Sequence, residues 1–129
     1  MVAADVLPAL VMLTESNRLE VQRAVALTLY NLSTLPANQV PIADTEAVPA
    51  LVGLSKSADI DVKRYAVMTL TNISSNTETR RHALRGGGIQ SLILVARDDD
   101  IECRRYAISA LANLACDTDT QIQVVQPKT

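Results

Sequence analysis

Apolar residues recur every three or four positions in the stretch VKRYAVMTLTNISS, residues 62–75. They are Val62, Ala66, Val67, Leu70 and Ile73. This spacing places them on one stripe of an α-helix, so we predict a long helix over residues 59–75 that buries the stripe. One polar residue, Asn72, stands near the end of this helix, although asparagine favours caps and turns over helix interiors.

The same pattern occurs three times along the chain at a constant spacing of 41 residues. The aligned segments are VQRAVALTLYNLS (21–33), VKRYAVMTLTNIS (62–74) and CRRYAISALANLA (103–115). One column of the alignment holds an asparagine and another an arginine: Asn31, Asn72 and Asn113, and Arg23, Arg64 and Arg105. The preceding segments VLPALVMLTES, AVPALVGLSKS and GIQSLILVARD align in the same way. The chain is therefore predicted to be a tandem array of helical units.

Each unit is predicted to contain a middle helix, a long helix and a short connector helix. Acidic residues such as Asp59 stand at the start of the long helix, where they favour the helix dipole. Residues 76–88 predict a connector helix that ends at a run of glycines. The equivalent stretch, residues 35–46, contains Pro36 and Pro41, so we expect its helix to be distorted or partly lost.

The units resemble armadillo repeats. The resemblance rests on the pattern G-G-I-x-x-L-V followed by V-x-x-x-A-x-x-x-L-x-N-L-A, which covers residues 5–126 in three versions. HEAT repeats are the nearest alternative, but the turn GGGIQSL and the ending LANLA favour armadillo. The resemblance implies an all-α, right-handed superhelix, closer to beta-catenin-like and vacuolar armadillo-like members than to importin-alpha.

We expect one array over residues 1–129, with units at about 5–34, 35–75 and 76–116 and a partial fourth unit at 117–126. Neither end shows the polar capping repeat that solenoids usually need for solubility. This favours a fragment of a longer array. The alternative is a small protein that covers its ends by self-association.

The composition agrees with closely packed helices, because 48% of residues are hydrophobic and only 2% are aromatic. The net charge of −2 does not indicate nucleic acid or membrane as a partner. Without a signal peptide or a long apolar run, the sequence indicates a soluble, intracellular and cytoplasmic chain. Cys103 and Cys116 are too far apart on one helix for a disulfide, and both are predicted to be buried packing residues.

The asparagine column lies at the edge of a polar stripe on the helical wheel. The column four residues earlier holds Leu27, Met68 and Ser109, and the column seven residues earlier holds Ala24, Tyr65 and Tyr106. In armadillo proteins the equivalent asparagines line a concave groove and bond to the backbone of an extended peptide. A carboxamide suits this task because it offers both a donor and an acceptor. The alternative is that the asparagine bonds to the backbone of a neighbouring repeat and stabilises the stack.

The charges bear on which peptide would bind. Importin-alpha-like members place a tryptophan four residues before each such asparagine, and these tryptophans hold lysine side chains. The absence of tryptophan here argues against nuclear-localisation signals. Residues 62–97 contain six basic residues and one acidic residue, which favours an acidic partner segment.

We therefore predict a non-enzymatic scaffold that binds an extended, acidic peptide segment of a partner protein. The predicted peptide-binding residues are Asn31, Asn72, Asn113, Tyr65, Tyr106, Met68, Ser109, Arg64 and Arg105. We expect no catalytic residue, metal, cofactor or membrane insertion, since the single histidine, His82, lies in a basic cluster and the acids Asp98–Asp100 are read as a solvated turn. The alternatives are a self-assembling solenoid segment that oligomerises through its ends and, less favoured, a nucleic-acid binder.

Overall fold

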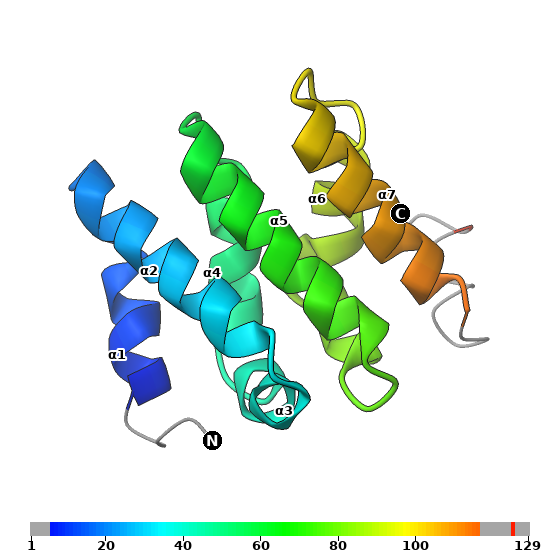
Figure 1. The fold of residues 1–129 in the computed structure, drawn as a ribbon, viewed down its shortest axis with the longest axis horizontal. Helices are drawn as coiled ribbons and strands as arrows, with labels where there is room; N and C mark the ends of the chain where they lie inside the picture. Colours follow the sequence, from blue (N-terminus) through cyan, green and yellow to red (C-terminus); the bar gives the residue numbers. More distant parts are fainter. Residues whose placement is uncertain (1–5, 117–124, 126–129) are drawn as a thin grey trace.

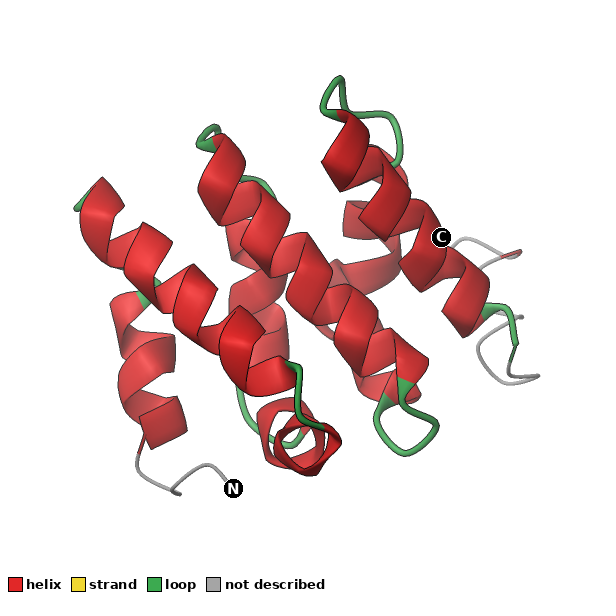
Figure 2. Cartoon of the chain, in the orientation of Figure 1, coloured by secondary structure: helices red, strands yellow, loops and turns green. Residues whose placement is uncertain are grey.

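The computed structural model describes residues 6–116 and Val125, and the regular structure of this part is helical (Figures 1 and 2). In chain order the elements are α1 (Val6–Leu13), α2 (Leu19–Ser33), α3 (Pro36–Ala43), α4 (Ala47–Leu54), α5 (Ile60–Ser75), the 3-10 helix η1 (Arg80–Gly87), α6 (Gly88–Val95) and α7 (Ile101–Leu114). None of these helices is long and apolar enough to cross a membrane. The expected fourth unit, residues 117–126, lies outside the described residues except for Val125.

The helices form two layers. The long helices α2, α5 and α7 lie side by side in one layer, and the shorter helices α1, α4 and α6 lie behind them (Figure 1). We call α1–α2 the first unit, α3–α5 the second and η1–α7 the third. The contact between the first and second units is the first junction, and that between the second and third is the second junction. The predicted solenoid of about three helical units is confirmed.

The core lies between the layers and is built from the columns that the apolar pattern singled out. In α5 all five predicted stripe residues are completely buried, namely Val62, Ala66, Val67, Leu70 and Ile73. Asp59 caps this helix, because its side chain accepts a hydrogen bond of 3.0 Å from the backbone N–H of Val62. The long helix therefore begins and ends as its sequence predicts.

The first connector departs from the prediction. Residues 36–43 form the regular α-helix α3, although two prolines lie in it. Pro36 stands in the first turn, where a backbone N–H has no partner in any case. Two amide side chains hold α3 to the end of α2: Asn38 donates to the Leu32 carbonyl at 3.1 Å, and Gln39 to the Ser33 carbonyl at 2.7 Å. These contacts stabilise a helix that Pro41 alone would weaken.

The second connector is instead the 3-10 helix η1, and it ends in a glycine corner. Gly86 and Gly87 have positive φ angles of 61° and 85°, which favour glycine. Gly88 is needed for a different reason: a Cβ there would lie 1.8 Å from the Ala83 carbonyl oxygen. The corner therefore requires glycine for two reasons: Gly86 and Gly87 adopt positive φ angles, and Gly88 lies too close to the Ala83 carbonyl for a Cβ.

The two cysteines differ. Cys103 is completely buried in α7, as predicted, and burial raises the pKa of its thiol to about 12. The prediction that Cys116 is buried is wrong, because this residue follows the end of α7 and is exposed. Both are free thiols.

Candidate functional site

The predicted peptide-binding residues come from all three long helices. Asn31 lies on α2, four more on α5 and four on α7. None of the nine is buried: Asn31, Ser109 and Arg105 are exposed, and the other six are half-buried. We call this set the amide stripe; its members are Asn31, Arg64, Tyr65, Met68, Asn72, Arg105, Tyr106, Ser109 and Asn113.

Asn72 connects two units. Its Nδ2 donates a hydrogen bond of 3.0 Å to the Ser33 hydroxyl at the end of α2. Ser33 in turn donates to the Tyr30 carbonyl at 2.7 Å. The alternative role considered for this asparagine, pairing with a neighbouring repeat, is therefore present at the first junction, although the partner is a side chain and not the backbone. A carboxamide has a second N–H and an acceptor oxygen, so this bond leaves capacity for a ligand.

The other two amides are in different situations. The residue equivalent to Ser33 in the second unit is Ser74, and it is buried with its hydroxyl bonded to the Leu70 carbonyl at 2.8 Å. Asn113 makes no side-chain hydrogen bond to another described residue, and it is half-buried. The same holds for the exposed Asn31, which has no described unit before it. The three equivalent asparagines thus differ in how free their amides are.

The two tyrosines of the amide stripe also differ. The Tyr65 ring lies 5.8 Å from the Tyr30 ring, with 30° between the planes, so it packs across the first junction. Thr71 takes the place of Tyr30 in the second unit, and its hydroxyl lies 2.9 Å from the Tyr106 carbonyl. Tyr106 therefore has no aromatic partner among the described residues. Sequence reasoning did not single out Tyr30, although its column lies next to the asparagine column.

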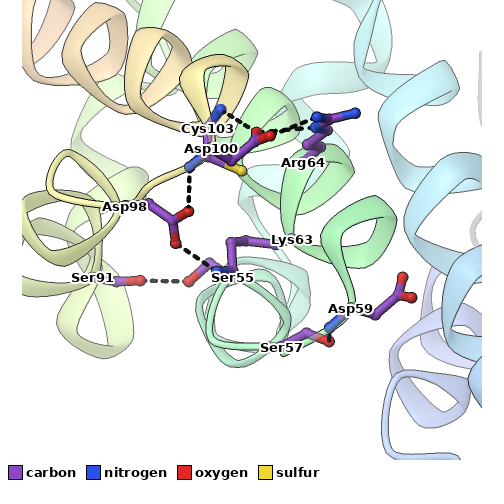
Figure 3. Close-up of polar contacts among 9 residues, drawn as sticks. All are labelled: Ser55, Ser57, Asp59, Lys63, Arg64, Ser91, Asp98, Asp100 and Cys103. Atoms are coloured by element: carbon purple, nitrogen blue, oxygen red, sulfur yellow. Dashed lines mark hydrogen bonds and ion pairs between the residues drawn. The ribbon is translucent and has the colours of Figure 1, made fainter.

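An arginine and an aspartate join each pair of neighbouring units. Arg23 binds Asp59 at 2.6 Å across the first junction, and Arg64 binds Asp100 at 2.5 Å across the second. Each aspartate also caps the next long helix; the Asp100 carboxylate accepts from the Cys103 backbone N–H at 2.9 Å (Figure 3). The hydrogen bonds from arginine, and then those from the capping N–H groups, lower the pKa of both aspartates.

These ion pairs determine which arginines of the column are available to a ligand. Arg64 was predicted to line the groove, but its guanidinium is held by Asp100. Arg105 binds no aspartate of a neighbouring unit among the described residues. Its side chain is 73% exposed, and its ion pair with Glu102 is long, at 3.7 Å. Arg105 is therefore the arginine of this column that a ligand could reach with least competition.

The acids Asp98–Asp100 are not merely a solvated turn. Asp98 binds the Lys63 ammonium at 2.5 Å, and the Ser55 and Ser91 hydroxyls bond to each other at 2.5 Å nearby (Figure 3). With Asp100 on Arg64, two of the three acids join the second and third units. The basic excess of residues 62–97 is thus partly neutralised by acids just beyond that window. In the described part of the chain, no three metal-binding side chains cluster together.

The comparisons with known proteins agree with this architecture. The profile of the Armadillo/beta-catenin-like repeat matches residues 1–34 and 36–75, more than half of the chain. The chain belongs to the armadillo repeat family. No curated protein matches its sequence. A closer likeness to beta-catenin than to importin-alpha stays a prediction.

Several solved structures share the fold. A computationally designed armadillo repeat protein for modular peptide recognition is 23% identical, with a TM-score of 0.86 over 93% of this chain and 52% of that one. A designed armadillo repeat protein in complex with the peptide (KR)4 is 22% identical, with a TM-score of 0.86 over 95% and 52%. An engineered protein is 30% identical, with a TM-score of 0.83 over 92% and 50%. The chain spans about half the length of these structures.

Proposed function

We propose that this protein is an interaction scaffold that binds an extended peptide segment of a partner protein along the amide stripe. The observation that carries the proposal is the row of unburied asparagine and tyrosine side chains on three adjacent long helices. The fold supports it, because a designed protein with the same architecture is seen in complex with a peptide.

The length of the bound segment follows from the geometry of the stack. Packed helices lie about 8–10 Å apart, and an extended chain covers about 3.3–3.6 Å per residue. Each unit then serves two or three peptide residues, and the three units together serve about six to nine. Asparagine side chains would bond to the peptide backbone, and the flat tyrosine rings would pack on its side chains.

The second junction is the stronger candidate for peptide contact. Among the described residues Asn113 has no side-chain hydrogen-bond partner and Tyr106 has no ring partner, whereas Asn72 and Tyr65 already contact the first unit. Arg105 adds an exposed positive charge to the same helix. We therefore propose that an acidic side chain of the peptide lies near Arg105.

The test uses two labelled octapeptides, one alternating glutamate with valine and the other lysine with valine. We expect the acidic peptide to bind the 129-residue chain and to shift the side-chain NMR signals of Asn113 and Tyr106. Asn113→Ala should weaken binding by about three- to tenfold, because it removes the hydrogen bonds that the Asn113 amide would form with the peptide backbone. Asn31→Ala is the matched control and should change affinity less. If neither peptide shifts the signals of the stripe, the proposal is wrong.

Self-assembly through the ends receives less support. A second copy stacked in register would place its Arg18 where Asp59 and Asp100 stand in the inner units, facing Arg105 of the first copy. Two arginines at that contact repel each other. Exposed apolar side chains such as Ile108 lie on α7, but charge opposes a second copy stacked in register on this helix. Light scattering over a concentration range should show a monomer.

A further inference from the structure

A cleft of about 440 Å³ lies on the layer of short helices, between α1 and α4 at the first junction. The residues that matter most to its shape and charge are Val11, Met12, Glu15, Glu46, Pro49 and Gly53. A second cleft of about 430 Å³ adjoins it and shares Val11 and Glu46. This groove, which we call the α1–α4 groove, is made by other helices than those of the amide stripe.

The same groove one unit further on is smaller. Between α4 and α6 it measures about 190 Å³. One cause is a residue that lines the groove, since Gly53 of the first groove corresponds to Leu94 in the second. A Cβ at Gly53 would meet nothing within 4 Å, so the space above this glycine is open. The repeat alignment thus identifies Gly53 as the position that widens the first groove.

A hydrogen bond also closes the second groove and is missing from the first. Ser55 and Ser91 join α4 to α6 through a bond of 2.5 Å. The equivalent residues at the first junction are Thr14 and Ala50, and alanine has no hydroxyl to complete the bond. Thr14 and Ser55 each donate to a carbonyl of their own helix, at 2.6 Å, so the difference between the two grooves lies in the missing hydroxyl of Ala50.

The charge of the two grooves is opposite. Glu15 lines the α1–α4 groove, and the equivalent residue in the second groove is Lys56. Glu46 adds a second carboxylate, and Asp44 lies in the adjoining cleft. Glu15 and Glu46 are exposed, and neither forms an ion pair with another described side chain. Their charges are available to a ligand.

The walls between these carboxylates are apolar. Helix α1 consists of apolar residues throughout, yet Leu7 is the only one of its eight residues that is buried. Met12 is 75% exposed at the edge of the groove, and its flexible thioether side chain can adapt to different ligands. An apolar groove with an acidic rim complements a segment that carries both aliphatic and basic side chains.

We propose that the α1–α4 groove binds a short segment of a partner protein in which an aliphatic side chain is flanked by lysine or arginine. The aliphatic group occupies the space above Gly53, and the basic groups pair with Glu15 and Glu46. This site lies on the opposite layer from the amide stripe and prefers the opposite charge. The two surfaces can therefore hold two segments at once.

The experiment uses a fluorescein-labelled hexapeptide, Lys-Lys-Leu-Leu-Lys-Lys, and its twin with glutamate in place of lysine. Fluorescence anisotropy measures binding to the full 129-residue chain. We expect the basic peptide to bind more tightly than the acidic twin, with an affinity that falls as salt is added. NMR shifts should locate it on α1 and α4.

The repeat itself supplies the variants. Gly53→Leu copies Leu94 of the third unit into the open space, so the fold should be kept, and binding should weaken by about tenfold or more because the aliphatic site is filled. Glu15→Lys copies Lys56 and should weaken binding by about three- to fivefold while reducing its salt dependence. Leu94→Ala, in the other groove, is the control and should leave binding unchanged.

Thermal unfolding of each variant checks that the fold is intact. Unchanged binding in Gly53→Leu, or peptide shifts confined to α2, α5 and α7, would overturn the proposal. If the basic hexapeptide does not bind, the proposal for the α1–α4 groove is wrong. The proposal that a peptide binds along the amide stripe is not affected, because it is tested with other peptides and other variants.

Discussion

The two junctions of this solenoid use the same columns of the repeat but differ in the side-chain contacts that each makes on the two layers. The first junction is joined on the layer of long helices, by the Tyr30–Tyr65 ring pair and the bond from Asn72 to Ser33. On the layer of short helices it is open, at the α1–α4 groove. At the second junction Ser55–Ser91 and Lys63–Asp98 join the side of the short helices, and Thr71 bonds to the Tyr106 carbonyl on the side of the long helices. The Asn113 side chain there has no hydrogen-bond partner among the described residues.

This difference shows how a repeat can vary its binding surfaces without changing its fold. The buried column that holds Leu29 and Leu70 is apolar and keeps the helices in place. The unburied columns exchange tyrosine for threonine, or glycine for leucine, at little cost to the core. Each junction can therefore present its own open surface.

The largest effect is expected where both junctions depend on one side chain. Leu70 is completely buried in α5, the helix that the two junctions share. Leu70→Ala should lower the free energy of unfolding by about 2–5 kcal/mol, because it leaves a cavity in the core. Urea unfolding followed by circular dichroism measures the change. Met68→Ala, two positions away and half-buried, is the control; an equal loss in both variants would contradict this account.

Acid should weaken both junctions together. The pKa of Asp59 and of Asp100 is lowered in the folded state, chiefly by the hydrogen bonds from Arg23 and Arg64. The stability from these pairs is therefore complete above the unfolded value of about 3.9 and is lost as the pH falls below it. We expect the melting temperature to be nearly constant from about pH 7 to pH 5 and to fall below about pH 4.

Asp100→Asn separates the contributions of the two pairs to this acid response. Its amide oxygen can still cap α7, but it has no negative charge to bind Arg64. The variant should unfold at a lower temperature than the wild type at neutral pH, and it should lose part of the fall at acid pH. A variant that keeps the full acid response would show that other carboxylates are responsible.

A smaller effect is expected from making the first junction resemble the second. Tyr30→Thr copies Thr71 into the first unit and removes the ring that packs on Tyr65. We expect a loss of about 0.5–1.5 kcal/mol in the free energy of unfolding, together with a change in the tyrosine fluorescence of Tyr65. An unchanged stability would mean that the ring pair contributes little to the first junction.

The smallest effect is expected at Asn113, in comparison with Asn72. Asn72→Ala should cost about 0.5–1.5 kcal/mol, since it removes the bond to Ser33. Asn113→Ala should cost less, because the Asn113 amide has no partner among the described residues. Denaturant unfolding of the two variants side by side tests the contrast. Equal losses would show that the two amides have the same structural role.

Much of the fold could be predicted from the chain because its signals are local. The apolar stripe of α5, its aspartate cap and the three-unit arrangement all follow from spacing within about 41 residues. The connectors were harder to predict. Pro41 suggested a broken helix, and the sequence did not show that Asn38 and Gln39 would bond to the end of α2 and support α3.

The chemistry of the candidate site was predictable only in part. The asparagine column and the two tyrosines were identified from the repeat, and the structure leaves them unburied. Arg64 was predicted to contact the bound peptide, but its partner is Asp100, 36 residues further along the chain. The count of charged residues over 62–97 ended before Asp98 and Asp100, so it overstated the positive charge of this region.

The sequence by itself determined the long helices, the aspartate cap of α5 and its apolar stripe, because helical periodicity and capping act over a few residues and repeat at a fixed spacing. The tertiary structure alone decided which amide is free, which arginine is held and which groove is open. These outcomes depend on the distance between side chains that stacking brings together from neighbouring units. Gly53 lines a groove and Arg64 forms an ion pair only because the adjoining unit is in place.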